Sequence, residues 1–165
     1  MEEYLNNIAE MKDVSNGFSI RSNGLLVGAI GAIDGWLVRI VKPSMYKDGQ
    51  QNPTSFYSRK GFYALNVQCI VDHQKKVRWV SYSHKGASHD SSYFRDTELY
   101  NKLNNMNDVL YEHVSFILGD SAYTLESFLL CPYLQPTPKS AEDAFNFYHS
   151  SARITVECAF WEIDI

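Results

Sequence analysis

The chain contains 165 residues with a mass of 18.9 kDa, which is enough for one domain with a sizeable core and too little for two. Hydrophobic residues account for 45% of the sequence and charged residues for 21%, and this balance excludes an intrinsically disordered chain. The formal net charge of −4 excludes a protein that binds nucleic acid through bulk positive charge, because that attraction requires clustered Lys and Arg.

The cysteines and the apolar segments indicate the cellular environment that the protein is expected to occupy. Cys69, Cys131 and Cys158 form no C-x-x-C pattern, so we expect neither a disulfide framework nor a structural zinc site, and a reducing intracellular environment. The longest apolar stretch, residues 24–33, is far shorter than the ~20 residues that span a bilayer. The sequence therefore predicts a soluble protein without a membrane partner.

Residues 1–23 are polar and predict an amino-terminal extension to which we assign no function. Weak helical spacing links Tyr4, Leu5, Ile8 and Met11, and turn-forming residues at 15–17 should end that helix. The main domain is expected to cover residues 24–165.

A first strand and a long loop open this domain. The strand pattern that begins at residue 24 contains Asp34 and stops at Pro43. Residues 43–60 are rich in turn formers, and the loop that they predict ends in the basic pair Arg59-Lys60. A loop of this length usually has a function.

The middle of the chain predicts a hairpin, two helices and a strand. Alternating apolar residues favour a β-hairpin, capping residues and helical spacing favour a helix, and a short apolar run leads directly into Asp120. The expected elements are the hairpin strands 62–72 and 77–82, a helix over 88–108, a strand over 115–118 and a short helix over 124–131.

The last segment, residues 141–163, predicts a long helix buried on two sides. One apolar face lies opposite a second stripe formed by Phe147, Ile154 and Trp161. A narrow polar row that includes Arg153 and Glu157 runs between the two faces. Glu157 should therefore project at a defined place from a mostly covered helix.

The order of strand, hairpin, helix, strand, short helix and long helix predicts an α/β fold, with a ribonuclease H-like mixed sheet and flanking helices. In that architecture the first and fourth strands are neighbours, which would bring Asp34 close to Asp120 while the last helix adds Glu157. Carboxylates that end apolar strands are costly unless a positive charge compensates them, and hydrated Mg²⁺ is a natural partner. The three acids thus indicate a two-metal nuclease site.

Each acid also has a structural explanation that the residues leave open. Asp34-Gly35 is a common hairpin-turn pair, Asp120 is placed for a turn or a cap, and Asp90 could cap the helix that it begins. Glu157 could form an i,i+4 ion pair with Arg153. One metal site, by contrast, explains all the acids together.

Seven short motifs, in the same order along the chain, carry a resemblance to a known family. The run from Gly31 to Phe160 resembles the Harbinger (PIF/Harbinger) superfamily of DDE transposases and the nucleases derived from them. The matching pieces are Ala32-Ile33-Asp34-Gly35, Tyr57-Ser58-Arg59-Lys60-Gly61-Phe62, Asn66-Val67-Gln68, Gly86-Ala87-Ser88-His89-Asp90-Ser91, Gly119-Asp120-Ser121-Ala122-Tyr123, Phe145-Asn146 and Arg153-Ile154-Thr155-Val156-Glu157.

The resemblance implies a DNA endonuclease or strand-transfer site that uses two Mg²⁺ or Mn²⁺ ions. Its catalytic, metal-binding triad would be Asp34, Asp120 and Glu157, and Asp90 would be a further metal ligand. Arg59 and Lys60 are the candidates for contacts to DNA phosphates, although the same pair could guard a sheet edge against aggregation. His89 and Arg153 are expected around the ligands, and a core position is the alternative for His89.

Departures from the family pattern leave a second function open. Trp36-Leu37 replaces the usual Thr-His, and Ala122 replaces a common Gly. After Phe160 other residues stand in place of the expected Gly and a downstream Lys, and we expect a domain truncated at its carboxyl end. The chain is either a Harbinger-type endonuclease or a catalytically inactive remnant that binds DNA or protein. Its implied partners are DNA and a Myb/SANT-like protein that supplies basic charge, and its implied location is the nucleus, with the cytoplasm as the alternative.

Overall fold

A five-stranded mixed sheet forms the centre of the computed structural model, which describes residues 1–44, 52–83, 89–106, 110 and 114–163. Strand β2 runs antiparallel to its neighbours β1 and β3, whereas β4 and β5 run parallel to β1. The predicted α/β class with a ribonuclease H-like sheet is confirmed. In the order β3-β2-β1-β4-β5 the strands cover Val77–Ser83, Ala64–Val71, Ala29–Arg39, Phe116–Leu118 and Leu129–Leu130.

Strand β1 carries Asp34 through the middle of the sheet. Its first half is fully buried, and its pairing with β2 continues through Asp34, which lies opposite Cys69. The Asp34-Gly35 pair is therefore within a strand and forms no hairpin turn. On the other side Ala32 pairs with Leu118 of β4, so the two strands reach Asp34 and Asp120 at the same level, as the sequence predicts.

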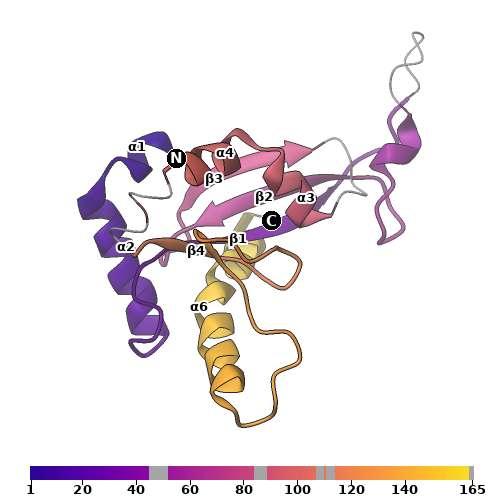
Figure 1. Ribbon diagram of the computed structural model, residues 1–165. Helices are drawn as coiled ribbons and strands as arrows, with labels where there is room; N and C mark the ends of the chain where they lie inside the picture. Colours follow the sequence, from indigo (N-terminus) through magenta and orange to yellow (C-terminus); the bar gives the residue numbers. More distant parts are fainter. Residues whose placement is uncertain (45–51, 84–88, 107–109, 111–113, 164–165) are drawn as a thin grey trace.

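Helices cover both faces of the sheet (Figure 1). Helix α6 extends below the strands in this view, whereas α3 and α4 lie at the height of β2 and β3. The bounds are Glu2–Leu5 for α1, Ile8–Arg21 for α2, Asp90–Arg95 for α3, Glu98–Asn105 for α4 and Ala141–Ile163 for α6, with a 3-10 turn η1 at Pro53–Phe56. Within the described part of the chain, no helix combines the length and the apolar character needed to cross a bilayer.

The first residues of the chain pack into the core of the sheet. Helix α2 continues through residues 15–17, so the predicted helix end there is wrong. Val14 and Phe18 on this helix are completely buried, and the Ser15 Oγ accepts a hydrogen bond of 2.7 Å from the amide of Gly28. Burial of the apolar face and this new partner for Ser15 outweigh the local preference for a turn.

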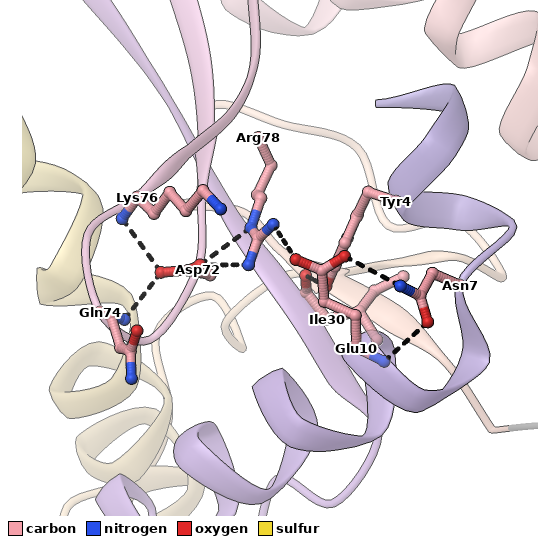
Figure 2. A network of polar contacts seen from close by, with 8 residues as sticks. All are labelled: Tyr4, Asn7, Glu10, Ile30, Asp72, Gln74, Lys76 and Arg78. Atoms are coloured by element: carbon pink, nitrogen blue, oxygen red, sulfur yellow. Dashed lines mark hydrogen bonds and ion pairs between the residues drawn. The ribbon is translucent and has the colours of Figure 1, made fainter.

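A buried ionic network ties α1 and α2 to the β2-β3 hairpin (Figure 2). Arg78 bonds Asp72 through Nε at 2.8 Å and forms an ion pair with Glu10 of α2. Its guanidinium also lies 4.7 Å from the ring centre of Tyr4, whose hydroxyl donates to the Ile30 carbonyl at 2.6 Å. Asp72 is only 1% exposed, so Arg78 compensates a carboxylate that water hardly reaches.

The middle of the chain confirms the hairpin and corrects two predicted helices. The predicted helix over 88–108 is two helices, because Thr97 accepts a hydrogen bond from the Tyr100 amide and caps α4. Ser88 and residues 107–108 lie outside the described residues, as do residues 45–51 of the predicted loop. No helix forms over 124–131, where Leu129 and Leu130 extend the sheet as β5.

Helix α6 is confirmed, but it is buried on one side only. Val156 and Ala159 face the core, whereas the predicted second apolar stripe is exposed. The exposed fractions are 69% for Phe147, 48% for Ile154 and 82% for Trp161. The sheet offers α6 a single surface, so a helix with two apolar stripes leaves one of them in solvent.

Candidate active site

Helix α6 brings a cation and a carboxylate to β1. Arg153 Nη1 donates a hydrogen bond of 3.0 Å to Asp34 Oδ2, and Arg153 Nη2 forms an ion pair with Glu157 Oε1 one turn further along the helix. Asp34 and Glu157 are therefore held on two nitrogens of one guanidinium. The i,i+4 pair that the sequence offered as a structural role exists, and it is part of this cluster.

Asp120 joins the cluster from the end of β4. Its Oδ1 accepts a hydrogen bond of 2.9 Å from the Ala122 amide, so it stabilises a turn as the sequence allowed. Its negative charge acts on both Asp34 and Arg153. The structure thus pairs Asp34 and Glu157 with Arg153, and it places Asp120 within electrostatic range of Asp34 and Arg153.

Asp34 has a perturbed acidity. Burial raises its pKa to about 6, and the negative charge of Asp120 acts in the same direction. The Arg153 guanidinium and the Gly35 amide, which donates to Asp34 Oδ1 at 2.8 Å, lower the pKa and offset part of this effect. Arg153 therefore compensates the buried carboxylate incompletely, and a carboxylate whose pKa is perturbed in this way is a candidate for a functional site.

Asp90 lies on the other face of β1. A Cβ atom on Gly35 would collide with Asp90 Oδ1, so glycine is what allows this carboxylate to rest on the strand. Adjacent residues of a strand point to opposite faces, and Asp34 points towards α6. Asp90 thus approaches β1 from the face opposite to the contact of Asp34 with Arg153, and its role as a further metal ligand stays a prediction.

Strand β2 holds Asp90 in place. Asn66 Nδ2 donates to Asp90 Oδ1 at 2.9 Å, and Gln68 Nε2 donates to the Asp90 carbonyl at 2.8 Å. The helix cap is His89, so Asp90 does not have the capping role that the residues alone left open. Sequence reasoning assigned no role to Asn66 and Gln68. Two amides at alternate positions of one strand, both buried, were the available signal.

The predicted DNA-contacting pair lies beside Asp90. A cleft of about 450 Å³ opens on this face, and both Arg59 and Lys60 are exposed at it. His89 is also exposed there, so the core position considered for it is wrong. The lining residues are Gly35, Trp36, Leu37, Tyr57, Ser58, Arg59, Lys60, Asn66, His89, Asp90 and Ala122.

The carboxylate oxygens of the three acids are suitable ligands for a divalent cation, but the side chains are not spaced closely enough to share one in this structure. Carboxylate oxygens are the ligands that Mg²⁺ and Mn²⁺ prefer, and Asp34, Asp120 and Glu157 supply them. Among the described residues, however, no group of three His, Cys, Asp or Glu side chains is gathered closely enough to hold a metal ion. Arg153 holds one oxygen each of Asp34 and Glu157, so a cation would have to share or replace these contacts.

Comparison with known protein families identifies the family to which these acids belong. The family described as DDE superfamily endonuclease matches residues 33–163, which include all three clustered acids. The chain belongs to the DDE superfamily endonuclease family. The predicted resemblance to Harbinger-type transposases and to the nucleases derived from them is thereby confirmed.

This DDE-family chain has relatives in mammals. It is 27% identical over 134 residues to the Bos taurus protein named "Putative nuclease HARBI1" and 28% identical over 131 residues to the Rattus norvegicus protein of that name. These alignments cover 81% and 79% of the chain but only 35% and 34% of the relatives. The chain thus spans about a third of the length of the curated relatives it matches.

A solved structure is also similar to the chain. It is the "Mos1 transposase paired-end complex with left transposon end", with 14% identity and a TM-score of 0.38. The similarity covers 93% of this chain and 61% of that one.

Proposed function

We propose that this chain carries the centre of a divalent-metal-dependent DNA endonuclease derived from a Harbinger-type transposase, acting by phosphodiester hydrolysis or strand transfer. The observation that supports it is that Arg153 pairs with Asp34 of β1 and Glu157 of α6, while the charge of Asp120 at the end of β4 acts on Asp34. Membership of the endonuclease family favours a nuclease site as the interpretation of this arrangement. Neither a local turn nor a surface ion pair requires this arrangement of all three acids.

In this proposal Asp34, Asp120 and Glu157 hold two Mg²⁺ or Mn²⁺ ions. Such ions supply an activated water or hydroxyl nucleophile and stabilise the departing oxygen. Asp90 is not counted among these three ligands, because it contacts β1 on the Gly35 side. It lines the cleft together with Arg59 and Lys60, the candidate DNA contacts.

Arg153 orients two of the acids for binding the cations. It is largely buried, with 15% of its side chain exposed, and its hydrogen bond and ion pair orient Asp34 and Glu157 towards one point. A fixed positive charge at that point reduces the repulsion between the carboxylates before any metal arrives. Arg153 thereby keeps the site assembled.

Recognition of DNA is proposed to begin at Arg59 and Lys60. Both are exposed at the mouth of the cleft, where a guanidinium fork and an ammonium group can contact phosphate oxygens. A net charge of −4 makes these contacts too weak by themselves. We therefore propose a basic partner of the Myb/SANT-like type, and the nucleus as the site of action.

A specific observation favours a second candidate function. The guanidinium of Arg153 satisfies both Asp34 and Glu157 without any metal, which is the arrangement expected of a catalytically inactive remnant. Such a protein would use the same cleft to bind DNA or a partner protein and would leave the DNA intact.

Cleavage of supercoiled plasmid DNA in Mn²⁺ distinguishes the two functions. Under the proposal the chain nicks the plasmid, and Asp34→Asn, Asp120→Asn or Glu157→Gln each reduces the rate at least about a hundredfold, because the metal ligands are lost. The matched control is Glu162→Gln, which changes an acid of the same helix that pairs with the exposed Lys75. It should cleave at the wild-type rate.

Equal rates for the wild type and the three site variants would end the catalytic proposal. DNA binding without cleavage, measured by fluorescence anisotropy and weakened by Arg59→Gln, would support the inactive remnant instead.

A further inference from the structure

Tyr123 has a buried hydroxyl group that forms no hydrogen bond with the described residues. It follows Asp120 in the turn after β4, and its amide donates to the Asp120 carbonyl at 3.2 Å. The side chain is 6% exposed, and among the described residues its hydroxyl has no hydrogen-bond partner. A buried hydroxyl without a partner is costly, so such a group needs an explanation.

Other tyrosines around this part of the sheet are satisfied. The hydroxyl of Tyr93 bonds Ser81 Oγ at 2.6 Å, and that of Tyr100 donates to Glu126 at 3.2 Å. The ring of Tyr123 packs edge-to-face on Phe94, with centroids 6.0 Å apart. Its apolar part is therefore well placed, and only the hydroxyl lacks a partner.

Charges from both faces of β1 act on this hydroxyl. The charges of Asp90, Asp34 and Asp120 all act on Tyr123, and the charge of Arg153 acts in opposition. Asp90 belongs to the cleft face of β1, whereas Asp34 belongs to the α6 face. Tyr123 is therefore within electrostatic range of carboxylates from both faces of β1. Burial, followed by these negative charges, raises the pKa of Tyr123, so the hydroxyl keeps its proton and remains a donor.

We propose that Tyr123 is a positioning residue of the acidic site, and that its hydroxyl donates a hydrogen bond to a carboxylate of this site when a divalent cation is bound. Bound cations draw carboxylates together, and hydrogen bonds from neighbouring side chains set the orientation of metal ligands. This inference rests on the proposed function, since it requires the cation. It explains why the hydroxyl is buried and still unpaired.

The test is a calorimetric titration of the full chain and of Tyr123→Phe with Mn²⁺. We expect the variant to bind Mn²⁺ about tenfold more weakly, because groups that orient metal ligands have effects of this size. In EDTA its melting temperature should equal or exceed that of the wild type, since no hydrogen bond is lost. The matched control, Tyr100→Phe, loses its bond to Glu126, so it should melt lower and bind Mn²⁺ like the wild type.

Three outcomes decide the matter. Weaker Mn²⁺ binding by Tyr123→Phe, with no loss of stability in EDTA, supports the positioning role. Equal Mn²⁺ affinities for the wild type and Tyr123→Phe overturn this role and leave the proposed nuclease function intact. A wild-type chain that does not bind Mn²⁺ overturns the nuclease function and the Tyr123 proposal together.

Discussion

At the scale of single residues, Asp34 is the most constrained group of the site. It lies in a central strand with 19% of its side chain exposed, and burial raises its pKa to about 6 in spite of Arg153. The folded chain therefore binds this proton more tightly than the unfolded chain does. A carboxylate of this kind lowers stability as the pH rises from about 4 to 6, because the folded state must then hold it charged.

The variant Asp34→Asn tests whether ionisation of Asp34 lowers the stability of the folded chain as the pH rises. Relative to the wild type it should gain about 2 kcal/mol of unfolding free energy between pH 4 and pH 7, since it has no proton to lose. Urea unfolding in EDTA at several pH values measures the difference. Asp13→Asn, on the exposed side of α2, controls for the removal of any carboxylate. A difference between Asp34→Asn and the wild type that does not change with pH would contradict the role of burial.

At the scale of elements, the junction between α2 and the β2-β3 hairpin depends on Arg78. This side chain is 11% exposed and compensates Asp72, which has almost no access to water. Arg78→Met should therefore lower the unfolding free energy by about 3 kcal/mol, because it leaves a buried carboxylate without its cation. Chemical denaturation provides the measurement. Lys75→Met, which breaks the exposed pair with Glu162, should show no measurable loss, and an equal loss in both variants would refute the argument.

At the scale of the whole molecule, the amino-terminal helices share one core with the sheet. Phe18 of α2 is completely buried, whereas Phe147 of α6 is 69% exposed. Phe18→Ala should cost about 3–5 kcal/mol of stability, because it removes a large side chain from a packed interior. The matched change Phe147→Ala should leave the thermal unfolding temperature unchanged. If Phe18→Ala unfolded at the wild-type temperature, α2 would be an appendage and not a part of the core.

The sequence by itself determined which acids are the candidates for the site and how most of the main elements follow one another. Asp34 in a strand, the hairpin and helix α6 follow from local periodicity and turn residues. The pairing of β1 with β4 follows from the ribonuclease H-like order of the elements. These signals are carried by neighbouring residues, so they are present in the chain before it folds. For the same reason the acids Asp120 and Glu157 could be named in advance.

Only the tertiary structure decided how these groups meet. It placed Asp90 across β1 from Asp34, set Arg153 between Asp34 and Glu157, and left the Tyr123 hydroxyl buried without a partner. It also turned Leu129 and Leu130 into a strand, because β4 offered them backbone partners. The face to which a side chain points and the charge that it meets depend on segments far away in the sequence, and local patterns do not contain this information.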